Sequence, residues 1–516
     1  MAGYDCDVAI VGYGPSGVSA ANFLGAYGVS AIAFERDRDI YLRARAVTVN
    51  DWTLRCYQAV GLDQTLLATM DRSSALRWRT YAGKELMRVV LQDSTLGQPP
   101  SSMIYQPVME GLLRQGAERF ADRVSVRYGQ EVSSVTQDAD GVSVTSQDIT
   151  SGAISSIRAR YLLACDGGGS TVRSQLGIRL LGSTVDTKWV VIDARVKRWW
   201  PERHLLTFWS DRKRPVVDIP LAQGNHRWEF PLDPDESEVD FATHEQLWRR
   251  LSTMGITPEH VDLHQHAFYK HHVRNAERWR SGRMFLVGDA AHLMPPWAGS
   301  GMQSGIRDAF NLSWKLREVL AGRLPESLLD SDEPERAPNV ALTTRMSEQM
   351  GRVIRMQMRP PEKLQALIGM IFFKLGMKLP PSPLGVPPHV ESGWIRGPVG
   401  KTSPVGRMIP QPKIANATGR HMWLDEALGS GFALLADGVD PASLLTSAER
   451  TGWDRLNARY VAVRSGFDAA QADSDLFDLD GSLVAWMRKH RTRAIALRPD
   501  RFVAAAQGSG LAVPGT

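Results

Sequence analysis

Residues 5–17 read DCDVAIVGYGPSG, and this stretch decides the fold of the first part of the chain. Its apolar half, residues 5–11, has the short uninterrupted pattern of a buried parallel strand. Residues 18–27, which follow the glycines, place apolar side chains at near-helical spacing. A strand that leads through a glycine turn into a helix predicts an α/β domain in which the helix N-terminus faces an anion.

The glycines of this turn fit a dinucleotide. Gly12 permits the tight turn, Gly14 lets the backbone approach a pyrophosphate, and Gly17 permits close packing of helix on strand. A second apolar segment, residues 30–34, ends in Glu35, whose carboxylate can accept hydrogen bonds from a ribose. A glycine-rich turn without a ligand is the alternative, and the turn alone does not distinguish FAD from NAD(P). The other residues assigned to this site are Pro15, Ser16 and Arg36.

The composition is that of a soluble globular protein. Its 516 residues, 43% hydrophobic and 23% charged, suggest about three domains. The cysteines Cys6, Cys56 and Cys165 are widely spaced, which argues against a disulfide framework or a metal cluster and favours a reducing compartment. We expect no metal and a cytoplasmic protein, because the sequence shows neither an apolar run of about 20 residues nor a signal peptide. The net charge of +5 is compatible with nucleic acid, an anionic lipid face or small anions, although the basic run 488–493 is short and lacks the interleaved aromatic residues of a nucleic-acid site.

Two further segments repeat the strand–turn–helix pattern. Residues 161–178 read YLLACDGGGSTVRSQLGI, an apolar strand followed by Asp166, Gly167 and, on a predicted helix, Arg173. An aspartate before a helix is usually an N-cap, so a structural role for this segment is the alternative to a ligand site. Residues 282–316 read GRMFLVGDAAHLMPPWAGSGMQSGIRDAFNLSWKL, which predicts a strand, a turn, a proline–glycine loop and a long helix. The turn is formed by Gly288 and Asp289.

Together, the three motifs resemble those of the class A flavoprotein monooxygenases, the single-component FAD-dependent aromatic hydroxylases. The likeness covers nearly the whole chain, and within the family it is strongest to the 3-(3-hydroxyphenyl)propionate hydroxylases. Further matching stretches are CDGGGSTVR at 165–173, SGIRDAFNLSWKL at 304–316, SPVGRMIPQP at 403–412, LDEALGSGFALL at 424–435 and RPDRFVAA at 498–505.

The resemblance implies FAD contacts for residues outside the first glycine turn. Asp289 would accept hydrogen bonds from ribityl or ribose hydroxyls, Arg45 would lie near the flavin and pyrophosphate, and Gln106 would contact FAD. The loop 295–302 would pass beside the isoalloxazine, with backbone N–H groups where negative charge gathers on reduction. The residues assigned to this loop and the turn before it are Gly288, Pro295, Pro296, Gly299, Gly301 and Met302. The residues that would serve both FAD and the approaching NAD(P)H are Asp166, Gly167 and Arg173.

The chain departs from the family pattern at two places. Relatives commonly have GQGMNS where residues 299–304 read GSGMQS, a change within the flavin loop. They often have YExER where residues 332–336 read DEPER, at the start of a predicted helix.

The region 181–270 has a different character. Four segments rich in β-branched and aromatic residues predict an antiparallel sheet, and they are 185–196, 205–210, 216–221 and 226–230. Its dense tryptophans are typical of a core and also suit a pocket for a flat aromatic ring. Arg214 is placed where a family member holds a substrate carboxylate, although an exposed turn in DRKR is an equal alternative. Pro295 and Arg214 are the catalytic candidates, and a tyrosine, a histidine or water remains open as the group that activates the phenol.

These patterns predict an α/β protein with α+β elements. We expect a discontinuous Rossmann-like FAD-binding domain with an inserted antiparallel-sheet substrate domain, followed by a helical connector. For the C-terminal domain, the resemblance to the hydroxylases implies a thioredoxin-like fold. The C-terminal domain would contain strands at 432–435 and 493–497 and a helix at 442–456, and it has no CxxC motif for thiol chemistry. The predicted boundaries are 1–72, 103–180 and 271–359 for the FAD-binding domain, 73–102 and 181–270 for the substrate domain, 360–398 for the connector and 399–516 for the C-terminal domain.

The resemblance implies hydroxylation of a phenolic substrate, such as a phenylpropionate-like acid. NADPH or NADH would reduce FAD, O₂ would add at the flavin C4a as a hydroperoxide, and one oxygen would enter the ring ortho or para to the phenol. A hydroxylase or Baeyer–Villiger oxygenase of a larger polycyclic or polyketide aromatic is one alternative, and a non-catalytic flavin-binding protein is another. The expected partners are a small aromatic substrate, O₂ and NAD(P)H, without nucleic acid or a membrane span, and a homodimer is compatible with the sequence.

Overall fold

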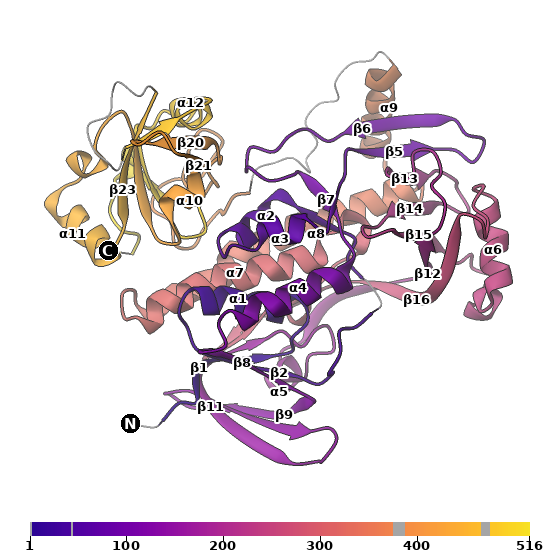
Figure 1. The fold of residues 1–516 in the computed structure, drawn as a ribbon, viewed down its shortest axis with the longest axis horizontal. Helices are drawn as coiled ribbons and strands as arrows, with labels where there is room; N and C mark the ends of the chain where they lie inside the picture. The colour runs from indigo at the N-terminus through magenta and orange to yellow at the C-terminus, as the bar shows by residue number, and fades with distance from the viewer. Residues whose placement is uncertain (1–2, 43–44, 375–387, 466–474, 516) are drawn as a thin grey trace.

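The computed structural model describes residues 3–42, 45–374, 388–465 and 475–515. Three large sheets and one small sheet organise this part of the chain (Figure 1). The first large sheet carries the glycine turn, the second forms the wall of a cavity, and the third belongs to the C-terminal part. No helix in the described part of the chain is long and apolar enough to cross a membrane.

The first sheet is parallel around the glycine turn. β1 (Cys6–Val11) lies between β2 (Ala31–Glu35) and β11 (Ile154–Ala164) and pairs in parallel with both. β8 (Val124–Tyr128) extends the parallel sheet beside β2, and β18 (Met284–Leu286) extends it beside β11. Alternate residues of β1 belong to two separate core clusters, because both faces of the sheet are covered. This double burial explains the uninterrupted apolar run of the sequence.

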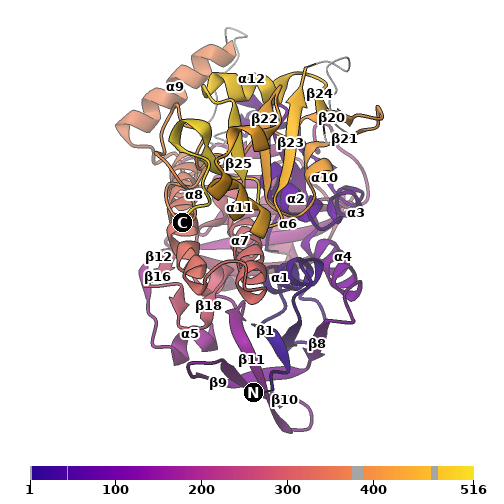
Figure 2. The same cartoon turned by 90° about the vertical axis from the view of Figure 1, so that its left-hand side faces the viewer.

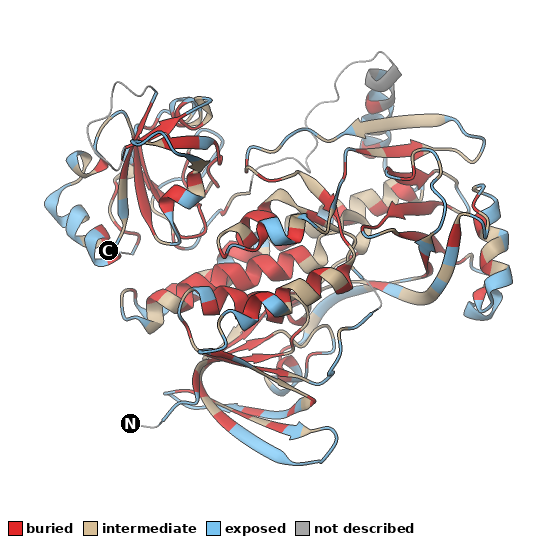
Figure 3. Cartoon of the chain, in the orientation of Figure 1, coloured by how far each residue is buried: buried red, intermediate tan, exposed pale blue. Residues whose placement is uncertain are grey.

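Helices cover one face of this sheet and a hairpin covers the other. α1 (Pro15–Ala26) packs between α4 (Gln106–Glu118) and α7 (Gly301–Leu320), and the three run side by side in Figure 1. On the opposite face, β9 (Gln130–Gln137) and β10 (Val142–Asp148) add apolar side chains to the second core cluster. α7 is buried along most of its length, as Figure 3 shows, because it also contacts the C-terminal part.

The second sheet has the order β19-β16-β12-β15-β14-β13-β5-β6. The four predicted strands of this region correspond to β12 (Leu180–Val196), β13 (Leu206–Trp209), β14 (Val216–Pro220) and β15 (Asn225–Pro231). The sheet is antiparallel except at one junction, where β5 (Ala75–Arg79) pairs in parallel with β13. Residues 75–90 therefore join a sheet formed mainly by residues 180–276.

A fifth long strand of this sheet was not predicted. β16 (Val261–Ala276) pairs with almost the whole length of β12. Its sequence, VDLHQHAFYKHHVRNA, contains histidines and other polar residues throughout and therefore lacks the apolar run that indicates a buried strand. Most of its residues are only partly buried, in agreement with this composition.

The third sheet forms the C-terminal part. β22 (Ala433–Asp437) and β23 (Arg459–Arg464) pair in parallel, and β25 (Ala494–Leu497) pairs antiparallel with β22. The predicted helix 442–456 is wrong as a single element, because a short 3₁₀ turn and α11 (Ser447–Arg455) replace it. Thr446 caps α11 in a reciprocal capping box with Glu449, and Leu445 before it is extended, which separates the two segments.

A buried ionic cluster joins the C-terminal part to the helices of the first domain. The Arg498 guanidinium lies 2.7 Å from the Glu335 carboxylate and 2.6 Å from that of Asp500, and Lys315 Nζ lies 2.8 Å from Glu335. Burial opposes the ionisation of Glu335, but Arg498 and Lys315 outweigh it and lower the pKa of Glu335 to about 2. The Trp314 indole donates to Asp500 at 3.1 Å. Figure 2 shows the C-terminal sheet in front of α7 and α8 (Asp332–Ile354), the helices that provide these partners.

The remaining elements complete the layers and the connections between them. The helices are α2 (Asp51–Gln58), α3 (Asp63–Leu67), α5 (Thr171–Gln175), α6 (His244–Ser252), α9 (Pro360–Lys374), α10 (Leu424–Leu428) and α12 (Ser482–Lys489). The strands are β3 (Thr48–Asn50), β4 (Asp71–Arg72), β6 (Glu85–Val90), β7 (Ser101–Met103), β17 (Arg280–Ser281), β19 (His292–Leu293), β20 (Lys413–Asn416), β21 (His421–Trp423), β24 (Leu476–Asp478) and β26 (Val503–Ala506).

Candidate functional site

A cavity of ≈ 3100 Å³ is lined by residues of both the first and the second sheet. This volume exceeds the roughly 300–1,000 Å³ of a typical small-molecule pocket, so it accommodates an extended cofactor together with a second molecule. Most of the residues predicted from the sequence line it. They are Gly12, Gly14, Pro15, Ser16, Glu35, Arg36, Arg45, Gln106, Asp166, Gly167, Arg173, Asp289, Pro296, Gly299, Gly301 and Met302.

The glycine turn forms one end of the cavity. Gly12 has φ +89°, and a Cβ there would lie 2.5 Å from the Cys165 carbonyl oxygen. A Cβ on Gly17 would lie 2.0 Å from the Gly12 carbonyl oxygen, whereas a Cβ on Gly14 would meet nothing within 4 Å. Gly12 and Gly17 are therefore required by the protein's own packing, and Gly14 keeps space open beside the N-terminus of α1. This arrangement fits a bound pyrophosphate.

Glu35 joins the end of β2 to the glycine turn. Its carboxylate accepts a hydrogen bond from the Tyr13 N–H at 2.7 Å and another from the Asp37 N–H at 2.9 Å. Because the side chain still lines the cavity, the carboxylate can also accept from a ribose hydroxyl. Arg36 lies next to it with a mostly exposed side chain.

The Asp166 segment and the Gly288 turn are linked by Arg173. The Arg173 guanidinium donates to the Ala290 carbonyl at 3.0 Å and to the Gly168 carbonyl at 2.9 Å. Asp166 Oδ2 accepts from the Val172 N–H, but Oδ1 is buried and has no hydrogen-bond partner among the described residues. Burial raises the pKa of Asp166. An unpartnered carboxylate oxygen at the cavity fits the acceptor that a cofactor hydroxyl would satisfy.

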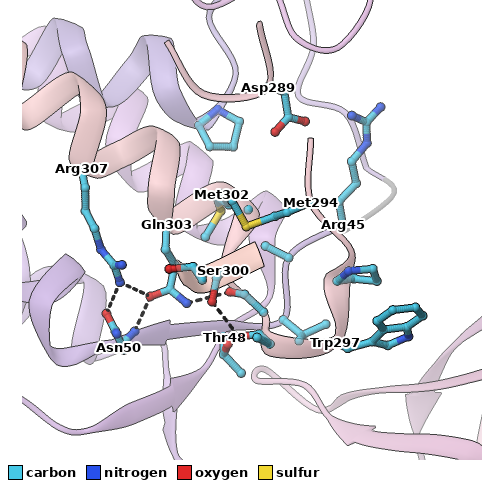
Figure 4. Close-up of a pocket in the computed structure, with 18 of the residues that line it drawn as sticks. Arg45, Thr48, Asn50, Asp289, Met294, Trp297, Ser300, Met302, Gln303 and Arg307 are labelled. Carbon is cyan, nitrogen blue, oxygen red and sulfur yellow. Dashed lines mark hydrogen bonds between the residues drawn. The ribbon is translucent and has the colours of Figure 1, made fainter. Parts of the chain in front are cut away.

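Asp289 and Arg45 lie on the same side of the cavity (Figure 4). Burial raises the pKa of Asp289, and His292 and Arg45 only partly offset this. The Gln106 side-chain carbonyl accepts from the backbone N–H groups of Arg45 and Ala46, both at 2.8 Å, and so fixes the segment that carries the guanidinium. A carboxylate and a guanidinium in this arrangement suit the hydroxyl and phosphate groups of FAD.

Gln303, one of the two residues of the flavin loop that differ from the family pattern, is part of a hydrogen-bond network (Figure 4). Its Nε2 donates to the Gly299 carbonyl at 2.7 Å, and its Oε1 accepts from the Asn50 N–H at 2.9 Å. Arg307 donates to Asn50 Oδ1 at 2.7 Å and lies over the Trp52 ring at 4.2 Å. Burial lowers the pKa of Arg307 to about 10, so the guanidinium remains charged at neutral pH. The longer Gln303 side chain thus connects the loop to α2 and β3.

Four predicted site residues do not line the cavity. Gly17 and Gly288 act through packing, because a Cβ on Gly288 would lie 2.5 Å from Ser16 Oγ. Pro295 is buried behind the loop, and its carbonyl accepts from Ser347 Oγ at 2.7 Å. The Arg214 guanidinium is held by Glu236 at 2.6 Å and Asp233 at 2.5 Å. The structure therefore does not bring the two catalytic candidates, Pro295 and Arg214, to the cavity surface.

The second sheet supplies a wall that the sequence did not reveal as a site. Its apolar lining consists mainly of Leu76, Trp78, Leu206, Phe208, Val217 and Ile219. Among the described lining residues, Glu229 is the one acidic side chain from this sheet. A glutamate within the aromatic strand sequence HRWEF was the available signal. Asn50 also carried a sequence signal, because asparagine directly before a helix is a typical N-cap residue, and its side chain caps α2 in the structure.

The sequence matches two family models. The model described as FAD binding domain matches residues 5–347, and the model described as HcaD C-terminal domain matches residues 406–512. A 3-(3-hydroxy-phenyl)propionate/3-hydroxycinnamic acid hydroxylase from Klebsiella pneumoniae (strain 342) is 33% identical, over 99% of this chain and 93% of its own length. A hydroxylase of the same name from Mycobacterium sp. (strain JLS) is 35% identical, over 97% of this chain and 89% of its own length.

Solved structures show the same fold along the whole chain. The flavin-dependent monooxygenase PieE, in complex with FAD and substrate, has a TM-score of 0.80 at 23% identity and covers 99% of this chain and 98% of its own. Aklavinone-11 hydroxylase, in a ternary complex with FAD and aklavinone, has a TM-score of 0.79 at 23% identity and covers 100% of this chain and 97% of its own. With the family models and the full-length relatives, this fold establishes that the chain belongs to the class A FAD-dependent monooxygenase family and is an FAD-dependent aromatic hydroxylase.

Proposed function

We propose that the protein hydroxylates a phenolic acid of the phenylpropionate class, ortho or para to its hydroxyl group, with NAD(P)H as the reductant. The full-length relatives named for 3-(3-hydroxy-phenyl)propionate support this substrate class. The observation that carries the proposal is the cavity itself, in which the glycine turn and Asp289 meet an apolar sheet wall. Such a wall suits a flat aromatic ring beside the cofactor.

Different residues of the cavity would bind different parts of the cofactor. The N-terminus of α1 and Gly14 would hold the pyrophosphate, while Asp166 and Asp289 would accept hydrogen bonds from cofactor hydroxyls. When bound, FAD supplies the redox chemistry that takes electrons from NAD(P)H and passes one oxygen atom of O₂ to the ring. The backbone N–H of Gly301 would stabilise negative charge at the start of α7, whereas that of Gly299 already donates to the Pro296 carbonyl at 2.7 Å. The sheet wall would exclude water from the reacting groups.

The test is NAD(P)H oxidation by the FAD-loaded protein against a panel of phenols, with identification of the products. We expect 3-(3-hydroxyphenyl)propionate to stimulate oxidation and to yield a catechol. Oxidation without any hydroxylated product, for every phenol of the panel, would contradict the proposal. NADH and NADPH are compared in the same assay.

A larger polycyclic aromatic is a second candidate substrate, because the cavity of ≈ 3100 Å³ is roomy even for a cofactor and a single-ring acid. A panel that includes tricyclic and tetracyclic phenols separates the two. Preference for the larger ring systems would favour this candidate, and a lactone or ester product would indicate Baeyer–Villiger chemistry.

The C-terminal part, residues 399–516, is proposed as a thioredoxin-like module without redox activity. The parallel strands β24, β23 and β22, followed by antiparallel β25 and β26, support this assignment. The sequence has no cysteine after Cys165, so a dithiol mechanism is excluded and a structural role follows.

A further inference from the structure

Glu229 is an isolated acid in the apolar wall of the cavity. It lies on β15, is 7% exposed, and stands directly opposite Val217 of β14, which also lines the cavity. A carboxylate in such surroundings loses much of its hydration and is retained only where it has partners or a function. The other polar side chains that this sheet contributes to the described lining are Arg88, His272 and Arg274, and none of them is a carboxylate.

Two side chains contact this carboxyl group. The Tyr269 hydroxyl on β16 donates to Glu229 Oε2 at 2.8 Å. Arg227 Nη1 lies 3.6 Å from Glu229 Oε1, while its Nε and Nη2 bind the Asp193 carboxylate at 2.7 and 2.9 Å. Among the hydrogen bonds of the described residues, one reaches Oε2 and none reaches Oε1. Oε1, which forms the ion pair with Arg227, therefore keeps the capacity to accept a hydrogen bond from a molecule in the cavity that Glu229 lines.

The contacts of this group place it near the flavin end of the wall. Arg227 Nη1 also donates to the Arg45 carbonyl at 3.4 Å, on the segment fixed by Gln106. The Tyr269 ring lies 4.8 Å from that of His271, which in turn lies 4.7 Å from the Trp297 ring in the flavin loop. Glu229 is therefore linked through Arg227 to the Arg45 segment, and through Tyr269 and His271 to Trp297 of the loop 295–302.

Burial and the neighbouring groups determine the pKa of the Glu229 carboxyl group. Burial raises the pKa of Glu229, and the nearby Asp193 carboxylate raises it further. The Arg227 guanidinium and the hydrogen bond from Tyr269 lower it. Burial and the Glu229 charge hold the pKa of Tyr269 well above its ordinary value, so the phenol remains a donor. Burial lowers the pKa of His271 to about 3, and this ring stays neutral. A carboxylate of raised basicity is better matched to a phenolic proton than an ordinary glutamate is.

We propose that Glu229 is the general base that removes the phenolic proton of the substrate, and that Tyr269 is a positioning residue that orients its carboxylate. The inference rests on the proposed function. In this step the substrate O–H bond breaks and a carboxyl O–H bond forms at Glu229, while the electron pair stays on the phenolate oxygen. The phenolate directs electron density to the ortho and para carbons that receive oxygen. The proton returns to the product before release, and no oxidation state changes.

Ionisation of a bound phenol tests the proposal without turnover. The oxidised FAD-loaded enzyme is titrated with 3-(3-hydroxyphenyl)propionate in the absence of NAD(P)H, and the phenolate is read from its ultraviolet difference spectrum between pH 6 and 10. For the wild type we expect the bound phenol to ionise at a pH about one unit or more above that for Glu229→Gln, because the Glu229 carboxylate disfavours a second negative charge beside it. A phenol in contact with Glu229 therefore ionises more readily once that charge is removed. The same titration gives the dissociation constant, which separates a change of binding from a change of ionisation.

A matched control removes a buried carboxyl elsewhere. Asp478 in the C-terminal sheet has a pKa raised by burial, like Glu229, but accepts from a backbone N–H and does not line the cavity. Asp478→Asn should leave the phenolate spectrum unchanged. Tyr269→Phe should retain phenolate formation but shift its pH profile, because the carboxylate keeps its charge and loses its orienting donor.

Turnover provides the second measurement. Glu229→Gln should lower kcat by about 10²-fold or more near neutral pH. It should recover at pH 10, or with a more acidic fluorinated phenol, because such substrates ionise unaided. Ionisation of the bound phenol at the same pH in Glu229→Gln and the wild type, or a wild-type kcat for Glu229→Gln near neutral pH, would overturn the inference while hydroxylation by the wild type upholds the proposed function. A wild type that binds none of the phenols would instead overturn the proposed function and, with it, the inference.

Discussion

The two ends of the cavity are built in different ways. At the cofactor end, backbone groups and loop residues do the work, and a turn such as Gly12–Gly17 is contiguous along the chain. At the sheet wall, each of β5, β13, β14 and β15 contributes one or two side chains. The space for the cofactor exists because glycines leave out a Cβ atom, whereas the surface of the wall is formed by the side chains that are present. Substitutions at the two ends should therefore produce separable defects.

The largest effect is expected from Gly17→Ala. The new methyl group would lie 2.0 Å from the Gly12 carbonyl oxygen, and neither backbone can move without displacing β1 or α1. We expect a loss of about 3 kcal/mol or more in the free energy of unfolding of the apoprotein. Thermal unfolding without FAD measures it.

Gly14→Ala is the matched control, because its methyl group meets nothing in the protein within 4 Å. The apoprotein should unfold like the wild type. FAD affinity should fall by about 10- to 100-fold, because the methyl group would crowd the bound pyrophosphate at a cost of about 1–3 kcal/mol. Quenching of flavin fluorescence gives the dissociation constant. Unchanged FAD affinity would remove the assignment of Gly14 to the cofactor.

At the wall, Ile219→Ala should show the opposite pattern. Ile219 is 3% exposed and lines the cavity, so truncation should cost about 2–4 kcal/mol of unfolding free energy. FAD affinity should stay the same and KM for the phenol should change. Ile219→Val should cost about 1 kcal/mol as the graded control. A substantial loss of FAD affinity in Ile219→Ala would break the separation between the two ends.

A smaller effect is expected from Gln303→Asn, which restores the residue common among relatives. The shorter side chain cannot keep both the 2.7 Å bond to Gly299 and the 2.9 Å bond from Asn50. One lost hydrogen bond is worth about 1 kcal/mol, so FAD affinity should fall by about fivefold. Equal or tighter FAD binding would show that the network does not position the loop.

The smallest effect is expected from Arg214→Ala. The partly buried guanidinium pairs with Asp233 and Glu236 outside the cavity, so its loss should cost less than about 1 kcal/mol of stability. KM should shift equally, or not at all, for carboxylated and neutral phenols. A larger increase in KM for carboxylated phenols than for neutral phenols would show that Arg214 contacts the substrate, and it would contradict the placement of Arg214 outside the cavity.

The site residues that the sequence predicts correctly belong to motifs that are contiguous along the chain. Gly14, Glu35 and Asp166 were recognised because each belongs to a strand–turn–helix pattern, and all three line the cavity. Glu229 and Tyr269 are 40 residues apart and meet across β12, a neighbour relation that exists only once the strand order is known. The strand that carries Tyr269 had itself escaped detection because of its polar composition.

The misplacement of Arg214 has a related cause. Its position before β14 was predicted from the sequence, but the acids that hold it come from the loop after β15. The broken helix at 441–455 was in principle readable, because Thr446 and Glu449 have the spacing of a capping box.

The Arg498–Glu335–Lys315 cluster sets a condition on how this protein can be recombined with its relatives. A chimera that takes its last 118 residues, 399–516, from another member keeps the Lys315–Glu335 pair but inherits the second partner of Glu335, Arg498, from a foreign chain. A donor without Arg498 would leave the buried Glu335 carboxylate without that guanidinium, at a cost of about 3–5 kcal/mol. Crossover points therefore have to keep α7, α8 and the segment 498–500 together as one inherited unit.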